Sequence, residues 1–193
     1  MKEEIYSLQN ALPELAQLSK EEQRLFQSIW EPLAVKRKEI ITAKGDTEKY
    51  LYFVAEGVQR IFSVQNEKES TLILTYAPSF GGVLDSFLLQ KPSAYFYESL
   101  TPSQFLRASH AKFQKVTASI PVLDQIIQRQ IHLAFSGLLE RMSELQNFTS
   151  EQNLKKLLAR SPHVLQLVPH KYIANYLGID PTNFSKLLNS IKF

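Results

Sequence analysis

The chain has 193 residues, 44% of them hydrophobic, and a formal net charge of +3. This length suits one domain plus a small second one, and the hydrophobic share excludes a disordered chain. The absence of Cys excludes disulfides, thiolate-held iron–sulfur clusters and thiol sensing. No apolar run is long enough to cross a membrane, and the first ten residues lack the apolar centre of an export signal, so we expect a cytoplasmic protein without membrane contact. The four His lack the paired spacing of metal ligands, so neither a metal site nor a cofactor is expected.

Charge is distributed unevenly along the chain. Residues 1–150 contain sixteen Lys/Arg and seventeen acidic residues, a net charge of −1. Residues 151–193 contain six Lys/Arg and two acidic residues, a net charge of +4. A basic module after a nearly neutral body indicates nucleic-acid binding, because cations that neutralise phosphates supply most of the affinity for DNA.

A capping box at residues 19–22 predicts a helix that begins at about Lys20. We expect Pro32 to end this helix and its buried side to consist of Leu25, Phe26, Ile29 and Trp30. From Leu33 to Ser109, short segments rich in aromatic and β-branched residues alternate with turn signals, which predicts a β-barrel or roll. Gly81-Gly82 interrupts this pattern and lets the backbone approach a ligand or another strand closely. A brief helix is expected over His110–Ser119.

A long helix is predicted from Pro121 to Phe148, about 42 Å in length. Its apolar positions recur every three or four residues: Ile127, Ile131, Ala134, Leu138, Met142, Leu145 and Phe148, with Ile126, Leu133 and Phe135 as a second set. Because such a helix is longer than a small barrel, we interpret one side as facing its own β-domain and the other as facing a second copy of the chain. The alternative is a helix that lies only on its own domain.

A second capping box, at residues 149–152, predicts a new helix over Glu151–Arg160 and marks a boundary in the chain. Residues 163–168 are expected to form a connector or strand. Two short helices follow, joined at Gly178, whose lack of a side chain permits the left-handed backbone that ends a helix. Asp180 can cap the second helix, and Pro181 fits its first position.

The second helix is expected to have an apolar inner side, formed by Phe184, Leu187, Leu188 and Ile191. Its outer side has short polar or basic groups: Thr182, Asn183, Ser185, Lys186 and Asn189. A helix-turn-helix that recognises DNA needs such an outer face, whose groups bond to base edges and phosphates. An ordinary helical hairpin at the end of a domain is the alternative.

The order of these parts resembles the Crp/Fnr family of bacterial transcription regulators, most closely its short Bacteroidetes-type members. The resemblance runs from about Leu12 to Lys192. Its motifs are Tyr172-Ile173-Ala174, Leu177-Gly178-Ile179 and Thr182–Leu187, and more loosely Lys44-Gly45-Asp46, Gly57 with Arg60, and Phe80-Gly81-Gly82. It implies an α+β fold in three parts. These are a cyclic-nucleotide-binding-like double-stranded β-helix (a β-roll effector domain) over residues 1–120, a dimerisation helix over 121–148, and a helix-turn-helix DNA-binding domain over 149–193.

The resemblance also implies a function, that of a homodimeric transcription regulator that binds double-stranded DNA. It leaves an unidentified small-molecule effector and RNA polymerase open as further partners. Carried over by position, the groups facing bases and phosphates would be Thr182, Asn183, Ser185 and Lys186, with His170 and Lys171 touching the adjacent DNA backbone. The effector pocket would contain Gly82, Val83, Leu84, Ser93 and Ala94.

Two departures from the family pattern qualify this expectation. Members that bind cyclic nucleotides carry a Glu shortly after the glycines and an Arg about ten residues later, whereas this chain has Val83 and then Ser93 or, with a one-residue shift, Pro92. A buried phosphate without a cation is costly, so we predict no tight binding of cyclic AMP or cyclic GMP. The sequence stops at Phe193 without a wing hairpin, which is expected to weaken backbone anchoring.

No catalytic set is recognisable in the sequence. It lacks a Gly-rich phosphate loop, a Ser elbow and a Cys nucleophile, so an enzyme is not expected. Four residues of the roll, Asp85, Tyr95, Tyr97 and Glu98, are interpreted as solvated surface groups rather than a catalytic cluster. The stretch 94–99 is interpreted as a half-buried strand, and a ligand pocket lined by its aromatic residues is the alternative. The rival to DNA binding is a small-molecule-binding or protein-interaction module whose C-terminal helices only complete the fold.

Overall fold

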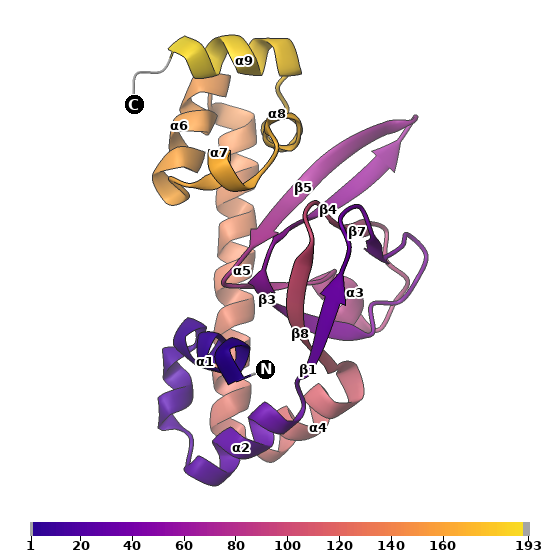
Figure 1. Ribbon diagram of the computed structural model, residues 1–193, viewed down its shortest axis with the longest axis vertical. Coiled ribbons are helices and arrows are strands. Elements are labelled where there is room, and N and C mark those ends of the chain that lie inside the picture. The colour runs from indigo at the N-terminus through magenta and orange to yellow at the C-terminus, as the bar shows by residue number, and fades with distance from the viewer. Residues whose placement is uncertain (1, 191–193) are drawn as a thin grey trace.

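The computed structural model describes residues 2–190, which are arranged along one long helix. Figure 1 shows this helix, α5 (Pro121–Asn147), running through the molecule from the N-terminal helices at one end to a small helical module at the other. The β-roll lies beside it, and the hairpin of strands β4 (Val58–Gln65) and β5 (Lys68–Tyr76) reaches toward the helical module. Among the described residues, no helix has the length and apolar character of a membrane span.

The N-terminal segment contains α1 (Lys2–Ala11), the 3₁₀ turn η1 (Pro13–Gln17) and α2 (Lys20–Ser28). The capping box is confirmed, because Ser19 Oγ accepts the Glu22 N–H while the Glu22 carboxylate accepts the Ser19 N–H. Two expectations were wrong: α2 ends before Pro32, which lies in a strand, and Leu25 is 43% exposed. The helix is short, and only its C-terminal turn faces the core.

Two four-stranded antiparallel sheets form the β-roll in the described part of the chain, as predicted. One contains, in spatial order, β1 (Glu31–Val35), β8 (Ser103–Ser109), β3 (Tyr50–Glu56) and β6 (Ser79–Gly81). The other contains β2 (Ile40–Thr42), β7 (Phe96–Ser99), β4 (Val58–Gln65) and β5 (Lys68–Tyr76). A short helix, α3 (Leu84–Leu89), connects β6 to β7. The two sheets enclose a core that includes Tyr52, Val54, Tyr97 and Phe105.

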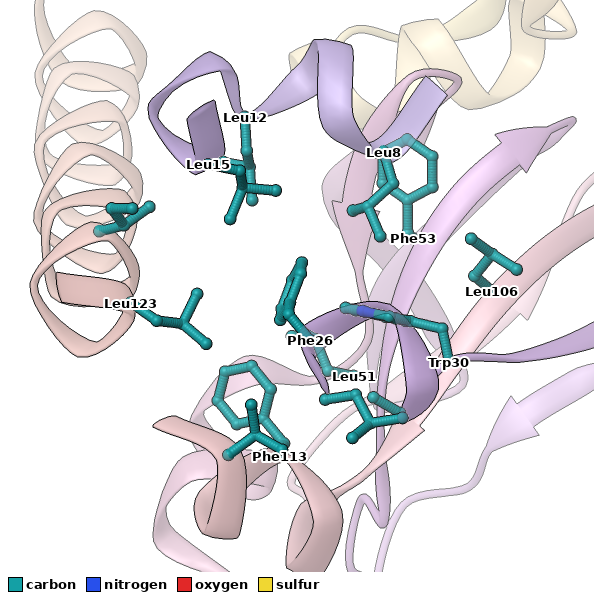
Figure 2. Packing of buried hydrophobic residues seen from close by; sticks show 14 of the residues in the cluster. Leu8, Leu12, Leu15, Phe26, Trp30, Leu51, Phe53, Leu106, Phe113 and Leu123 are labelled. Carbon is teal, nitrogen blue, oxygen red and sulfur yellow. The ribbon is translucent and has the colours of Figure 1, made fainter. Parts of the chain in front are cut away.

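A large apolar cluster joins the roll, the N-terminal helices and the first half of α5 (Figure 2). Its central members are Leu8, Phe26, Trp30, Phe53, Phe113 and Leu123. Phe113 comes from α4 (His110–Ser119), the helix expected at this position. Each fully buried side chain of this size contributes about 1.5–3 kcal/mol, so the cluster fixes α5 firmly to its own domain.

The C-terminal module contains α6 (Ser150–Arg160), α7 (Val164–Leu167), α8 (His170–Leu177) and α9 (Pro181–Ser190). The capping box at Thr149 is confirmed. The segment 163–168 contains a single helical turn and forms no strand, because its buried residues point into a helical core. That core includes Leu154, Leu157, Ile173 and Phe184. The expected contact of Ile191, like Lys192 and Phe193, lies outside the described residues.

Candidate nucleic-acid interface and effector pocket

The turn between α8 and α9 has the geometry that the sequence predicts. Gly178 has a φ of +70°, which ends α8 in the left-handed region. Ile179 is buried beneath the turn. The Asp180 carboxylate accepts the backbone N–H groups of Thr182 at 2.8 Å and Asn183 at 3.3 Å, so it caps α9. These local contacts fix the angle between the two helices.

Helix α9 is divided into a buried side and an exposed side. Phe184 is buried in the module, and Leu187 and Leu188 are half-buried. The predicted outer residues are all exposed: Thr182, Asn183, Ser185, Lys186 and Asn189. The Ser185 hydroxyl donates to the Pro181 carbonyl within the helix, which leaves it to accept hydrogen bonds from other groups.

The two predicted residues at the start of α8 have different surroundings. His170 is exposed and lies edge-on to the Phe184 ring, with 5.8 Å between ring centroids, so it sits beside α9. Lys171 is also exposed, but its ammonium lies over the Tyr172 ring and lines a hollow between α8 and the β-roll. The structure therefore groups five of the six predicted DNA-contacting residues around α9, and places Lys171 toward the roll.

The second half of α5 carries a row of exposed apolar side chains. Six of them are between 51% and 61% exposed: Leu133, Phe135, Leu138, Leu139, Met142 and Leu145. At about 100° per residue, Leu133 lies on the opposite side of the helix from the other five, which share one face; we call that face, formed by Phe135, Leu138, Leu139, Met142 and Leu145, the apolar stripe of α5. A contiguous row of this kind is unusual on a monomeric surface and marks an interaction site.

The C-terminal module is anchored to the end of α5 by buried charges. Glu144 is 2% exposed and forms ion pairs with Arg160 at 2.9 Å, Arg141 at 3.6 Å and Lys156 at 3.7 Å. Arg141 also donates to the Tyr176 carbonyl at 2.7 Å. These contacts tie α5, α6 and α8 together.

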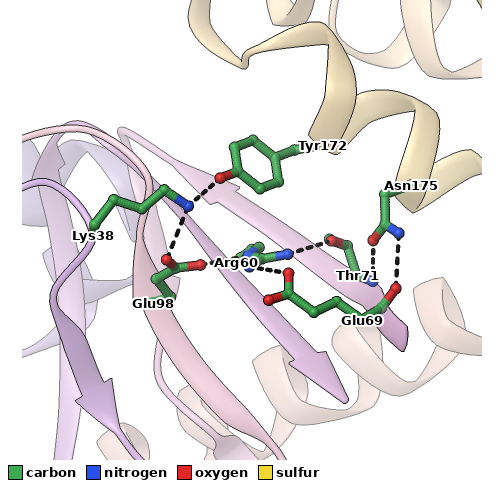
Figure 3. A network of polar contacts seen from close by, with 7 residues as sticks. All are labelled: Lys38, Arg60, Glu69, Thr71, Glu98, Tyr172 and Asn175. Atoms are coloured by element: carbon green, nitrogen blue, oxygen red, sulfur yellow. Dashed lines mark hydrogen bonds and ion pairs between the residues drawn. The ribbon is translucent and has the colours of Figure 1, made fainter. Parts of the chain in front are cut away.

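A second polar network joins α8 to the β-roll; we call it the junction (Figure 3). Its residues are Lys38, Arg60, Glu69, Thr71, Glu98, Tyr172 and Asn175. Arg60, buried at 2% exposure, forms 2.6 Å ion pairs with Glu98 and Glu69. The earlier interpretation of Glu98 as a solvated group was therefore wrong, because Arg60, 38 residues away in sequence, pairs with it inside the protein. Tyr97 is likewise fully buried and Tyr95 half-buried, whereas Asp85 is exposed.

Side chains of α8 complete the junction. The Lys38 ammonium donates to Glu98 at 3.0 Å and also to the Tyr172 hydroxyl. Although burial lowers the pKa of Lys38, its hydrogen bonds to Tyr172 and Glu98 raise that pKa above the ordinary value. The Asn175 amide lies along β5, where it accepts the Thr71 N–H at 2.6 Å and donates to the Glu69 carbonyl at 2.9 Å. The orientation of the helix-turn-helix is thus coupled to the β4–β5 hairpin.

The predicted effector-pocket residues occupy different environments. Gly82 has a φ of +105° and lines, with Leu84, a cleft between the roll and α5. Val83 is buried in the core, Ala94 is exposed, and the buried Ser93 hydroxyl is hydrogen-bonded to the backbone of Tyr95. Of the five predicted residues, only Gly82 and Leu84 line this cleft.

Glu48, which the sequence did not single out, lies beside this region. Its carboxylate, in a residue 2% exposed, accepts hydrogen bonds from Thr42 Oγ1 at 2.5 Å, the Tyr50 N–H at 3.2 Å and the Val83 N–H at 3.4 Å. Burial raises the pKa of Glu48, partly offset by these hydrogen bonds. These three donors are therefore already hydrogen-bonded to a carboxyl group of the protein.

Comparisons with known proteins agree with this architecture. Residues 32–119 match the cyclic nucleotide-binding domain family. FixK2 from Bradyrhizobium japonicum is 12% identical, with 83% of each chain covered and a TM-score of 0.75. A putative transcriptional regulator of the Crp/Fnr family from Eubacterium rectale is 16% identical, with 93% of this chain and 86% of that chain covered and a TM-score of 0.69.

A third similar structure is the catabolite activator protein of Thermus thermophilus. It is 20% identical, with 92% of this chain and 85% of that chain covered and a TM-score of 0.52. At such identities the likeness shows the fold, and no curated protein sequence matches the chain. Residues 32–119 are thus similar to the cyclic nucleotide-binding domain family, and the chain has the same fold as these solved structures.

Proposed function

We propose that this protein is a homodimeric transcription regulator that binds double-stranded DNA through α9. The observation that carries the proposal is the exposed polar and basic face of α9, held on a fully apolar inner side and capped by Asp180. Residues 151–193, which include this helix, have a net charge of +4. Such a helix can enter a major groove, where amides and hydroxyls bond to base edges and a Lys contacts phosphate.

The apolar stripe of α5 supports the dimeric part of the proposal. A second copy of the helix would cover side chains such as Phe135, Leu138 and Met142, which water otherwise surrounds. Two-fold pairing along α5 would place one C-terminal module on each side of the axis. Productive binding then requires the two copies of α9 to lie about one DNA turn, roughly 34 Å, apart.

The similar structures support a regulatory rather than an enzymatic role. Their printed names describe a catabolite activator protein and a putative transcriptional regulator of the Crp/Fnr family. A similar structure from Xanthomonas campestris is described as a c-di-GMP-responsive global regulator, and one from Silicibacter pomeroyi as a putative cAMP-binding regulatory protein, so the ligands named for proteins of this fold differ. For this chain we retain the prediction that cyclic AMP and cyclic GMP do not bind tightly, since Val83 and Ser93 supply neither the Glu nor the Arg.

Binding to duplex DNA tests the proposal directly. Selection from a random oligonucleotide pool should yield a two-fold symmetric site. On that site Asn183→Ala should reduce preference at one base position by about 1–3 kcal/mol, while leaving affinity for random DNA unchanged. Lys186→Ala should weaken binding to all sequences and reduce the salt slope by about one. Fluorescence anisotropy at several salt concentrations measures both effects.

Lys44→Ala is the matched control, because Lys44 is an exposed lysine in a turn of the β-roll. It should change neither the affinity nor the salt slope. A chain that stays monomeric and leaves DNA unbound even at low salt would instead favour the rival function, a small-molecule-binding or protein-interaction module whose C-terminal helices do not bind DNA.

A further inference from the structure

We propose that the cleft between the β-roll and α5 binds a small, uncharged, mostly apolar molecule. The cleft has a volume of about 390 Å³, within the range of small-molecule sites. Its walls come from four parts of the fold: Ile61, Ile73 and Phe80 of the roll, Leu88 of α3, Phe113 of α4, and Ile131 and Ala134 of α5. Binding of such a molecule to the cleft does not depend on the proposed function. An effect of that binding on DNA recognition does rest on the proposed function.

The chemistry of the walls selects the ligand class. Among the described residues that line the cleft, none is charged, and Thr75 and Gln130 are the polar side chains. The Thr75 hydroxyl already donates to the Gln59 side chain, so it can accept a hydrogen bond, and an amide such as Gln130 can donate or accept. A charged ligand would lose its hydration in this cleft without gaining a partner of opposite charge. An apolar molecule with one or two hydrogen-bonding groups has no such cost.

Glu48 strengthens the discrimination against anions. Its carboxyl group accepts the N–H of Val83, the residue after Gly82, at 3.4 Å and the Thr42 hydroxyl at 2.5 Å. The backbone N–H that follows the cleft-lining Gly82 is therefore already paired within the protein. An anion placed beside Gly82 would also approach a carboxyl group of the same sign when Glu48 is ionised.

A molecule in the cleft would touch the part of α5 that begins the apolar stripe. Leu133 and Ala134 line the cleft, and Phe135, the first residue of the stripe, follows them directly in the sequence. If the ligand binds one position of α5 against the roll better than another, it shifts the population of that position. Because α5 also holds the C-terminal module, this is a physical route from the cleft to the spacing of the two copies of α9.

A pair of fluorescent probes with the same ring system tests the ligand class. N-phenyl-1-naphthylamine is uncharged, and 8-anilinonaphthalene-1-sulfonate adds a sulfonate to the same skeleton. The full-length protein should bind the uncharged probe saturably, with one site per chain, and bind the sulfonate at least tenfold more weakly. Equal or tighter binding of the sulfonate, or no saturable binding of the uncharged probe, would overturn the proposal.

Two variants that fill the cleft from opposite walls locate the site. Ala134→Phe enlarges a side chain of α5 and Leu88→Trp one of α3, and each should weaken binding of the uncharged probe at least fivefold. The control is Met142→Ala with Leu145→Ala, which removes exposed apolar groups of the stripe away from the cleft and should leave probe binding unchanged. Probe binding lost in this control but kept in both fillers would place the probe on the stripe and refute the cleft.

DNA binding measured on the same samples separates this proposal from the proposed function. A dimer that binds its selected duplex but not the uncharged probe refutes the cleft and leaves the regulator intact. A protein that binds the probe but no duplex refutes the regulator and leaves the cleft intact. Because Leu88 lies on α3, outside α5, the Leu88→Trp result also remains decisive if Ala134→Phe disturbs dimer formation.

Discussion

The two ends of α5 are held by opposite kinds of interaction. At its start, Leu123 and Ile126 are buried among aromatic and aliphatic side chains of the N-terminal helices and the roll. At its end, the buried groups are Arg141 and Glu144, which bond to charged and polar groups of the C-terminal module. Apolar burial scales with area and tolerates small changes of angle, whereas ion pairs and hydrogen bonds depend strongly on geometry.

The difference indicates which part of the molecule can be repositioned at low energetic cost. Buried ion pairs contribute little net stability, because desolvation offsets much of the attraction. The contact between the module and the roll includes the apolar residues Val58 and Leu100, but at α8 it depends on the polar junction. We therefore expect the roll and the start of α5 to move as one body, and the C-terminal module to be the element that changes position.

Loss of apolar packing at the start of α5 should have the largest effect. Leu123 is 0% exposed, so Leu123→Ala should lower the free energy of unfolding by about 2–5 kcal/mol through the lost burial and the cavity left behind. The neighbouring Val122 is 37% exposed, and Val122→Ala should change that free energy by no more than about 0.5 kcal/mol. Chemical denaturation measures both variants. Similar losses for the two would mean that the cluster does not anchor the helix.

Glu144 gives an intermediate effect at the other end of α5. Because two of its three partners are partly solvated, Glu144→Gln should cost about 1–3 kcal/mol, mostly by leaving the buried Arg141 without its anion. The double replacement Arg141→Met with Glu144→Leu should recover most of that loss, since apolar residues avoid the desolvation cost. The exposed Glu140, which also pairs with Lys156, is the control: Glu140→Gln should cost at most about 1 kcal/mol. A double variant less stable than the single one would show that the charges here stabilise the protein in their own right.

The features predicted from the sequence are those determined by neighbours in the chain. The caps at Ser19, Thr149 and Asp180 form between residues no more than three apart, and Gly178 adopts the left-handed turn expected of it. The strands and the long helix follow from periodicity. The two N-terminal elements α1 and η1 were not anticipated, because residues 2–11 carry no capping box and α1 is held mainly by Leu8 in a distant core.

The junction could not be predicted because its partners are far apart in sequence. Asn175 and Thr71 are 104 residues apart, and Tyr172 and Lys38 are 134 apart. Tyr172 belongs to a motif that the sequence singles out, and it is buried, but the sequence offered no sign that its hydroxyl would reach the roll. The structure itself marks this position: Lys38 has a φ of +69°, a rare conformation for a residue with a side chain and one that often occurs at functional sites.

Asn175 provides the smallest expected effect. Its amide bonds to the backbone of β5 through two hydrogen bonds, one to the Thr71 N–H and one to the Glu69 carbonyl, in a setting that water can reach. Asn175→Ala should therefore lower the free energy of unfolding by only about 1 kcal/mol, while hydrogen exchange at the Thr71 amide becomes about fivefold faster. Asn189→Ala, on the exposed face of α9, should change neither quantity. A loss comparable to that of Leu123→Ala would mean that the junction is as strong as the apolar cluster, and the C-terminal module could then not change position independently of the roll.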